Sequence, residues 1–288
     1  MKINHTHTGD CLELSKKLEN SSIQSIITSP PYFQQRDYAG SKLKEVGQEK
    51  KTEEYVLRLT ELFETLHSKI KDDGTLWLNL GDKYIQGNLA GMPWQVALAL
   101  KKTGWKLRSD IIWHKPNAMP SSVKTRPTTD HEYLFLFSKK DKYYYDSDSI
   151  REPHKTFSED SKMKGGRNHF GKKDATPESG KYSGYQGLHS GDWTKTFNPL
   201  GRNKRTVWSV PISRSKETHF AVFPEELVLP CVLAGCPPGG VILDPFMGSG
   251  TVGRVALKNN RDYIGFELNP KYSKLSNKLT KSIQKELI

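Results

Sequence analysis

Cysteine is scarce in this sequence of 288 residues, and its three cysteines show no paired spacing. Cys11, Cys231 and Cys236 contain no CxxC pair, so we expect no disulfide framework and a reducing, cytoplasmic compartment. Long apolar runs are lacking as well. The N-terminus has no apolar signal segment, and no run approaches the length that spans a membrane. The sequence therefore predicts a soluble chain without a membrane partner.

Acidic residues are too few to balance the basic ones. The chain has 44 Lys and Arg against 32 Asp and Glu, a formal net charge of +12. Residues 151–206 alone hold 12 Lys and Arg against 6 Asp and Glu, with eight glycines and no sustained apolar pattern. We expect this range to be a loop-rich insertion that binds a polyanion. Its histidines, His154, His169 and His189, lack metal-ligand spacing, so no metal site is expected.

Outside that insertion, apolar strand-like runs alternate with amphipathic helical stretches, which is typical of a parallel α/β sheet. Because no clear helix separates residues 132–137 from the strand before them, we expect an antiparallel strand there. Asp72 to Gly74 is expected to form a turn. The expected strands are 23–29, 75–80, 105–113, 132–137, 241–243 and 263–267, and the expected helices are 52–70, 93–102, 225–234 and 251–259.

A strand that ends in two prolines stands near the N-terminus. Thr28-Ser29-Pro30-Pro31-Tyr32 follows an apolar run. The prolines remove two backbone donors and fix φ at about −65°, so they end the strand in a rigid turn. Ligands of open α/β sheets bind just beyond the carboxyl ends of strands. The turn therefore places a hydroxyl, carbonyl oxygens and an aromatic ring where a ligand is expected, although a purely structural turn is the alternative.

A second pattern lies far downstream. A short apolar strand at 241–243 leads into a turn with Gly248 and Gly250 and then into a helix. The next strand ends in Glu267, 23 positions after Asp244, close to the offset of roughly 20 residues for a carboxylate that binds ribose hydroxyls. The turn lacks the Lys-Ser/Thr ending of a P-loop and the third glycine of a dinucleotide site. The expected ligand is therefore a nucleoside without a phosphate chain.

Together, the two patterns resemble the S-adenosylmethionine-dependent amino-methyltransferases of DNA that serve restriction-modification systems. Residues 28–32 resemble the family's SPPY-type catalytic motif, and residues 244–251 resemble its FxGxG cofactor motif. The catalytic motif comes first, which is the family's β arrangement, with the target-recognition region between the two motifs. The likeness covers nearly the whole chain, because further segments also resemble the family: 76–82, 113–117, 126–132 and 219–227.

The resemblance implies an α/β fold with a circularly permuted Rossmann-like sheet. The sheet is expected to be mostly parallel with one antiparallel strand, and to carry a loop-rich recognition insertion. The permutation makes the N-terminal stretch 2–9 the strand that would otherwise follow the final helix. The expected domains are a catalytic half at 1–140, a target-recognition insertion at 141–206 and a cofactor-binding half at 207–288.

The resemblance also implies functional residues. In the catalytic turn, the Ser29 hydroxyl and the Pro30 carbonyl accept hydrogen bonds from the target amine, and Tyr32, held by Pro31, stacks on a base swung out of the duplex. The implied S-adenosylmethionine-binding residues are Asp10, Cys11, Thr28, Asp244, Phe246, Gly248, Gly250, Thr251 and Glu267. The expected contacts to duplex DNA are Lys115, Lys124, Arg126, Arg167, Lys172, Lys173, Arg202 and Arg205.

A serine at the first catalytic position goes mostly with the N4 amine of cytosine in this family. The predicted reaction is therefore cytosine-N4 methylation, with adenine N6 as the alternative. Carbon-5 methylation is disfavoured, since the one Pro-Cys pair, at Cys231, lies in an apolar helix-like stretch. An RNA or glutamine-amide acceptor, and an inactive homologue that only binds DNA, also stay open. A cognate restriction endonuclease that acts separately is the expected partner.

Overall fold

The computed structural model describes residues 1–35, 45–154, 198–212 and 223–286. The chain divides into two compact units. The larger unit combines Met1–Ser149 with Arg205–Ile288, and the smaller unit is Ile150–Lys204.

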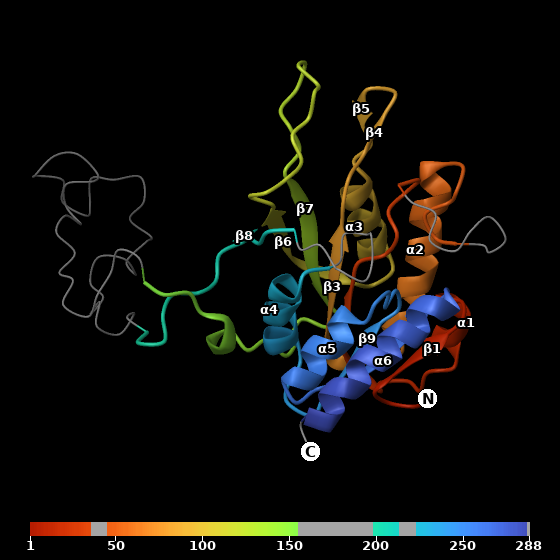
Figure 1. Ribbon diagram of the computed structural model, residues 1–288, viewed down its shortest axis with the longest axis vertical. Coiled ribbons are helices and arrows are strands. Elements are labelled where there is room, and N and C mark those ends of the chain that lie inside the picture. The colour runs from red at the N-terminus through yellow and green to blue at the C-terminus, as the bar shows by residue number, and fades with distance from the viewer. Residues whose placement is uncertain (36–44, 155–197, 213–222, 287–288) are drawn as a thin grey trace, which may run out of the picture. The chain divides into compact units, whose positions relative to one another are not determined.

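An eight-stranded sheet forms the centre of the larger unit (Figure 1). Within this sheet, as the structure describes it, only β7 runs antiparallel to its neighbours, β3 and β6. This confirms the expected mostly parallel sheet with one antiparallel strand. In spatial order the strands are β1 (His5–Thr8), β10 (Asp262–Glu267), β9 (Val241–Asp244), β2 (Ile23–Thr28), β3 (Ile70–Leu80), β7 (His131–Ser138), β6 (Lys106–His114) and β8 (Val207–Ser209).

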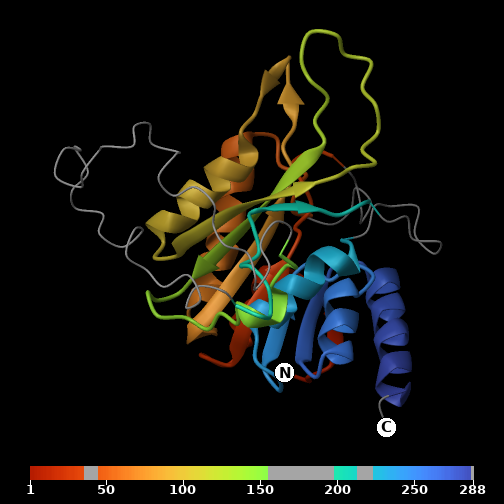
Figure 2. The ribbon, with the colours of Figure 1, turned by 90° about the vertical axis from the view of Figure 1, so that its left-hand side faces the viewer.

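Helices cover both faces of this sheet, as Figure 2 shows. One face carries α1 (Cys11–Lys16), α2 (Thr52–His67) and α3 (Met92–Lys102). The other carries α4 (Glu225–Gly235), α5 (Thr251–Lys258) and α6 (Pro270–Glu286). All six residues of β2 are buried, because a central strand covered on both faces has no solvent side. Cys231 is buried inside α4.

Two local expectations differ from the structure. The helix expected to reach residue 70 ends at His67, and Ile70 already begins β3. Asp72 to Gly74 lies inside β3 rather than in a turn, at a point where the register between β2 and β3 shifts. The strand stays paired with β2 on both sides of these residues, so the polar sequence at 72–74 forms a β-bulge and not a turn between two elements.

The sequence patterns did not predict several short secondary-structure elements. A hairpin of β4 (Tyr84–Ile85) and β5 (Asn88–Leu89) follows β3. Its two turn residues, Gln86 and Gly87, have φ of 48° and 83°, the left-handed values that a tight two-residue hairpin requires. A 3₁₀ turn at Asp148–Ile150 is another short element.

The edge strand β1 is covered by polar side chains of α6. The Asn277 side chain accepts a hydrogen bond from the Thr6 N–H at 2.8 Å and donates one to the Thr6 carbonyl at 2.9 Å. Ser273 donates to the same carbonyl at 3.2 Å, and the Ser276 and Thr6 hydroxyls lie 2.7 Å apart. Asn277 thus satisfies the exposed side of β1 as a neighbouring strand would, which removes an edge open to aggregation. β1 also pairs with β10, as expected from the permuted order.

The described part of the smaller unit is a clasp between its two ends. Glu152 and Arg202 form an antiparallel bridge, with N–H to carbonyl hydrogen bonds of 2.9 and 2.8 Å in the two directions. Their side chains form an ion pair at 3.1 Å.

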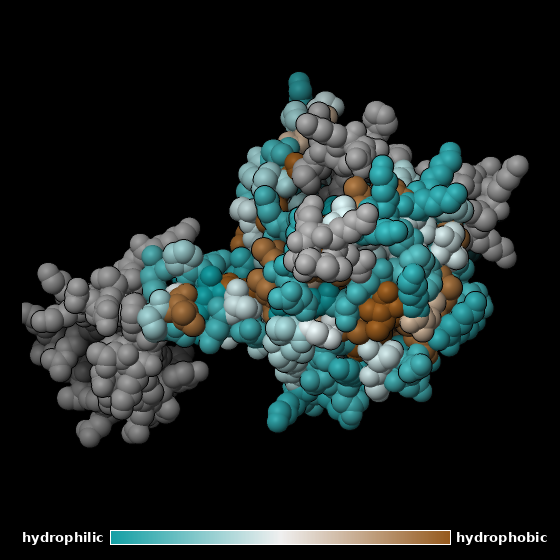
Figure 3. All heavy atoms as spheres, turned by 60° about the horizontal axis from the view of Figure 1, so that its bottom comes forward, coloured by the Kyte–Doolittle hydropathy of each residue, from teal (hydrophilic) through white to brown (hydrophobic). Residues whose placement is uncertain are grey.

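Hydrophilic residues cover most of the described surface on the face seen in Figure 3. α6 contributes four exposed lysines at helical spacing: Lys271, Lys274, Lys278 and Lys281. None of the helices in the described part of the chain has the length and apolar character needed to cross a bilayer.

The two hydrogen bonds between the Asn277 side chain and the Thr6 backbone predict a loss of stability when the side chain is removed. Asn277→Ala should lower the free energy of unfolding by about 1–2 kcal/mol, since two hydrogen bonds to the Thr6 backbone are lost. Lys278→Ala is the matched control on the exposed face of the same helix and should change it by less than about 0.5 kcal/mol. Urea unfolding measures both variants. Equal free energies of unfolding would show that the Asn277 side chain does not stabilise β1.

Candidate active site

A cavity of about 560 Å³ lies at the carboxyl edge of the sheet. The chain leaves β9 toward β10 and leaves β2 toward β3, so it runs in opposite directions from two neighbouring strands. Such a switch point is where open α/β sheets bind their ligands. Seven strands supply residues at this edge: Gly9 after β1, Ser29 after β2, Asn79 in β3, Lys115 after β6, Glu132 in β7, Asp244 in β9 and Glu267 in β10.

The proline turn forms one wall of the cavity. Ser29, Pro30, Pro31 and Tyr32 all line it. The turn is also tied to the core, because the buried Tyr55 of α2 donates a hydrogen bond from its hydroxyl to the Pro31 carbonyl at 3.0 Å. The rigidity expected from the two prolines is therefore reinforced by a helix of the core.

The Tyr32 ring lies against the backbone of Gly81. A methyl group at position 81 would lie 2.6 Å from Cε2 of Tyr32, well inside van der Waals contact. Position 81 therefore requires glycine so that the ring can approach the main chain. This contact fixes one face of the ring within the cavity.

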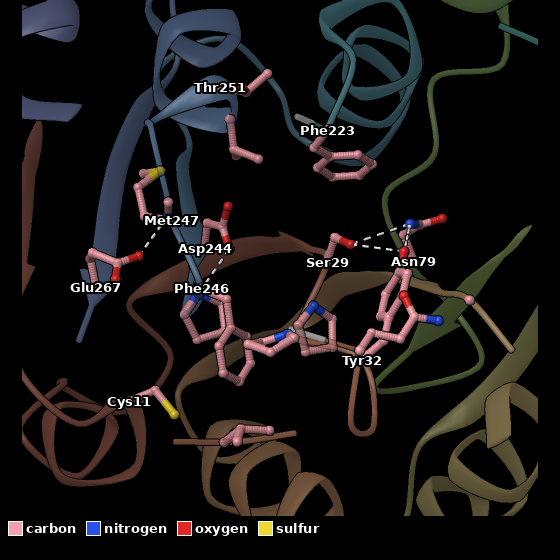
Figure 4. Close-up of a pocket in the computed structure, with 18 of the residues that line it drawn as sticks. Cys11, Ser29, Tyr32, Asn79, Phe223, Asp244, Phe246, Met247, Thr251 and Glu267 are labelled. Carbon is pink, nitrogen blue, oxygen red and sulfur yellow. Dashed lines mark hydrogen bonds between the residues drawn. The ribbon is translucent and has the colours of Figure 1, made fainter. Parts of the chain in front are cut away.

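Ser29 stands at the end of a hydrogen-bonded chain, and its contacts with Tyr32 and Asn79 can be followed in Figure 4. Its Oγ lies 3.2 Å from the Tyr32 hydroxyl and accepts from Asn79 Nδ2 at 3.3 Å. The Tyr32 hydroxyl donates to Glu132 Oε2 at 2.5 Å and accepts from Asn79 Nδ2 at 2.6 Å. Glu132 Oε1 is ion-paired with Lys115. Burial, and then the Glu132 charge, raises the pKa of the Tyr32 hydroxyl well above its usual value, so this hydroxyl stays protonated.

Two carboxylates shape the other wall, on the opposite side of the view in Figure 4. Asp244 Oδ1 accepts from the Thr28 hydroxyl at 2.7 Å and from the Phe246 N–H at 3.0 Å. Glu267 accepts from the Gly248 N–H through Oε2 and from the Asn269 N–H through Oε1, both at 2.8 Å. Glu267 thus holds the glycine turn in place from the neighbouring strand.

Burial makes this wall costly to ionise. Burial raises the pKa of Asp244 to about 7. Burial also raises the pKa of Glu267, and repulsion from the buried Glu45 raises it further. A cationic ligand would relieve both effects, because its charge favours the ionised carboxylates. The wall therefore suits a molecule that carries positive charge and hydroxyl donors.

Five other residues expected at the cofactor site also line the cavity: Asp10, Cys11, Phe246, Gly248 and Thr251. Asp10 also caps α1, accepting hydrogen bonds from two backbone N–H groups of its first turn. Cys11 is buried, which raises the pKa of its thiol to about 12 and keeps it unreactive at neutral pH.

Two expected cofactor residues lie behind the cavity wall. Thr28 is fully buried and orients Asp244 through its hydroxyl. Gly250 begins α5 with φ of 89°, and a methyl group there would clash with Oγ of Ser276 in α6. Both residues support the loop that lines the cavity, and neither lies in the lining itself.

The residues expected to contact DNA are scattered. Lys115 lies in the cavity, Lys124 and Arg205 are exposed, and the Arg126 guanidinium stacks 3.6 Å from the ring centroid of Tyr84 in the hairpin. Arg202 pairs with Glu152 in the smaller unit. These assignments stay predictions. Three further residues lie outside the described part of the chain: Arg167, Lys172 and Lys173.

Asn79 and Glu132 are cavity residues that the sequence analysis left without a role. Both belong to segments that resemble the methyltransferase family, so their position was marked but their chemistry was not. Glu132 lies at the start of an antiparallel strand, which brings it to the same edge as the ends of the parallel strands. A polar residue at the beginning of the one antiparallel strand was the signal that could have revealed it.

Comparison with known proteins identifies relatives of this chain. A family model described as DNA methylase, of the N6/N4 methyltransferase type, matches residues 23–278. The chain is similar to the Type II methyltransferase M.Cfr9I of Citrobacter freundii, at 39% identity over 293 residues that cover 92% of this chain and 83% of that protein.

Two solved structures share the fold. One is the PvuII DNA methyltransferase (cytosine-N4-specific), with a TM-score of 0.67 and 21% identity, covering 99% of this chain and 95% of that one. The other is a putative DNA modification methylase of Thermus thermophilus complexed with S-adenosyl-L-methionine, with a TM-score of 0.62 and 22% identity, covering 97% of this chain and 93% of that one.

The raised pKa of Asp244 predicts a pH-dependent stability. Its carboxyl ionises near 3.8 in an unfolded chain and at about 7 in the folded protein, so the folded state binds an extra proton between these values. The free energy of unfolding therefore falls as the pH rises through this window. Asp244→Asn keeps an oxygen for Thr28 and Phe246 and should be more stable than wild type by about 2–4 kcal/mol at pH 8.

Urea unfolding of the ligand-free proteins at pH 4 and pH 8 measures this difference. The advantage of Asp244→Asn should shrink to less than about 1 kcal/mol at the lower pH, where Asp244 is protonated in the folded state and close to half-protonated in the unfolded chain. A difference that does not change with pH would mean that the carboxylate is not strained by burial.

Proposed function

We propose that this chain, which belongs to the DNA methylase family, transfers a methyl group to the N4 amine of a cytosine in duplex DNA. The family match shows a DNA methylase. Its use of S-adenosylmethionine is supported by a structure of the same fold that is complexed with this cofactor, and a role in restriction-modification by the Type II methyltransferase to which the chain is similar. The choice of cytosine N4 is the proposal. The observation that carries it is the hydroxyl of Ser29, a neutral side chain at the head of the proline turn, in the same cavity as the Glu267 wall.

The cavity residues fit this cofactor. S-adenosylmethionine, when bound, supplies an electrophilic methyl group on a sulfonium sulfur and leaves as a neutral thioether. Glu267 offers carboxylate oxygens for ribose hydroxyls, and the buried carboxylates around it match the positive charge of the donor. Asp10 and Cys11 would lie beside the adenine ring, and Asp244, Phe246 and Gly248 beside the remainder. Thr28, Gly250 and Thr251 would hold this loop in shape.

The catalytic turn supplies orientation rather than a strong base. The lone pair of a cytosine amine is delocalised into the ring, so it must be turned toward the methyl group. Acceptors at Ser29 Oγ and the Pro30 carbonyl would hold both amine hydrogens and stabilise the positive charge that develops on nitrogen. Once the nitrogen carries the methyl group, one amine proton would become acidic and would leave to solvent water, so neither acceptor needs to be a strong base. Tyr32 provides a ring for the base swung out of the duplex.

Cytosine N4 is favoured over adenine N6 by the serine at position 29. In the family, an Asp or Asn at this place goes mostly with adenine. A structure that shares the fold belongs to an enzyme whose name specifies cytosine N4, so the architecture accommodates that reaction. Adenine N6 is the second candidate, because the family model covers both amines.

Duplex DNA would approach the cavity along basic residues. Exposed Lys124 and Arg205 would contact phosphates, and Lys115 would meet DNA only inside the cavity, beside the extruded base. Arg126 and Arg202, and the basic residues at 167, 172 and 173, are proposed as further contacts. A separate cognate restriction endonuclease is the proposed partner.

Analysis of methylated DNA tests the base. The purified protein should convert duplex DNA that carries its site into a product whose enzymatic digest contains N4-methylcytosine by mass spectrometry. N6-methyladenine alone would replace the proposal with the second candidate. Methylation of RNA or of a glutamine amide, with none on duplex DNA, would remove both.

Ser29 and Glu267 should fail in different ways when replaced. Ser29→Ala should lower kcat by about 10²-fold, because an acceptor for the reacting amine is lost, with S-adenosylmethionine affinity changed by less than about threefold. Glu267→Ala should weaken that affinity by about 10- to 100-fold. Calorimetry and single-turnover methylation separate the two effects. Full turnover by Ser29→Ala, or unchanged affinity of Glu267→Ala, would contradict the assigned role.

A further inference from the structure

Glu132 is a nearly buried carboxylate that the proposed reaction leaves without a role. Its side chain is 13% exposed and lines the cavity from the start of β7. It lies among groups that come from three other strands: Tyr32 follows β2, Asn79 lies in β3 and Lys115 follows β6. A carboxylate at such a meeting point either stabilises the fold or organises the reacting groups.

The two oxygens of Glu132 have separate partners. Oε1 pairs with the Lys115 ammonium, which also lies 4.6 Å from the ring centroid of Trp113. Oε2 accepts from the Tyr32 hydroxyl at 2.5 Å and from Asn79 Nδ2 at 2.8 Å. An ionised carboxylate can only accept hydrogen bonds, so every one of these groups must donate to it.

Because Glu132 can only accept, it also fixes the direction of the hydrogen bond between Tyr32 and Ser29. The Tyr32 hydroxyl has one proton, and that proton is committed to Glu132. Toward Ser29, 3.2 Å away, Tyr32 can therefore only accept, so the Ser29 proton points at Tyr32. Asn79 Nδ2 has two protons, and its shorter contacts are to Tyr32 at 2.6 Å and to Glu132 at 2.8 Å, so its contact of 3.3 Å leaves the Ser29 oxygen with lone pairs to offer. A hydroxyl ordered in this way is an acceptor for an incoming amine.

We propose that Glu132 is a positioning residue that sets the direction of the hydrogen bonds in the site, so that Ser29 presents a lone pair to the target amine. The inference rests on the proposed function, because it gives Ser29 the role of amine acceptor. It adds that Ser29 depends for this role on a carboxylate 103 positions away, through Tyr32. Lys115 contributes by pairing with Oε1, which leaves Oε2 to Tyr32 and Asn79.

Replacing Glu132 with glutamine should reverse this order. The amide oxygen of the glutamine would face Lys115, which needs an acceptor, and its nitrogen would then donate to Tyr32. The Tyr32 proton would turn toward Ser29, and the Ser29 proton toward the target amine, where two donors would meet. Glu132→Gln should therefore lower kcat by about 10²-fold and change S-adenosylmethionine affinity by less than about threefold.

A double-mutant cycle with Tyr32→Phe separates this role from a structural one. Without the Tyr32 hydroxyl, Glu132 and Ser29 still share the Asn79 amide nitrogen, but that nitrogen can only donate and so cannot pass a reversed hydrogen bond on to Ser29. Glu132→Gln should then change the kcat of the Tyr32→Phe protein by less than about threefold. A similar loss of kcat in both backgrounds would overturn the proposal, and so would wild-type kcat in the single Glu132→Gln variant. Glu61→Gln, at an exposed glutamate of α2, is the matched control and should behave as wild type.

A conservative variant extends the test. Glu132→Asp keeps a carboxylate, which can only accept hydrogen bonds, so it should retain more than about a tenth of wild-type kcat. A folded Glu132→Asp protein whose kcat falls by about 10²-fold, as expected for Glu132→Gln, would overturn the proposal even if Glu132→Gln did not fold.

The experiment also distinguishes this inference from the proposed function. If wild type makes N4-methylcytosine and the cycle shows no coupling, only the inference fails. If wild type methylates adenine or no DNA at all, the proposed function fails, and the cycle is not needed to show it. Thermal melting and S-adenosylmethionine binding of each variant confirm that the compared proteins are folded.

Discussion

The site depends on one hydrogen bond that joins two ends of the chain. Thr28 Oγ1 donates to Asp244 Oδ1 at 2.7 Å, across 216 positions of sequence, where β2 and β9 lie side by side. One of these residues immediately precedes the proline turn, and the other opens the glycine turn. Any shift in the register of these strands would move the proline turn relative to the glycine turn. Burial of both residues makes that register costly to change.

The two walls of the cavity use charge in opposite ways. On the Asp244 and Glu267 side, buried carboxylates are left with raised pKa values, which a cationic ligand can relieve. On the Ser29 side, the Glu132 carboxylate is matched by Lys115 and directs its remaining acceptor sites to protein donors. The wall with Asp244 and Glu267 therefore suits a cationic ligand, and the wall with Ser29 suits neutral groups that need to be oriented. A transfer of a methyl cation between them needs both.

Much of this arrangement was predictable, because it follows from rules about strand ends. Ser29 and Glu267 follow apolar runs in a pattern that places them at one sheet edge, and the missing helix before residue 132 revealed the antiparallel strand. Contacts between distant segments were not predictable. The close approach of the Tyr32 ring to Gly81, and the chain from Ser29 to Glu132, depend on side chains that meet across several strands. The β4–β5 hairpin has strands of two residues, too short to show periodicity.

The clasp between Glu152 and Arg202 bears on how enzymes of this kind diversify. Two backbone hydrogen bonds and an ion pair already bring the ends of the smaller unit together. The entropic cost of closing a loop grows only slowly with its length, so the residues between these ends can be lengthened, shortened or exchanged at little cost to folding. Exchanging that segment would change the DNA contacts proposed at positions 167, 172 and 173, while the residues that line the cavity stay the same.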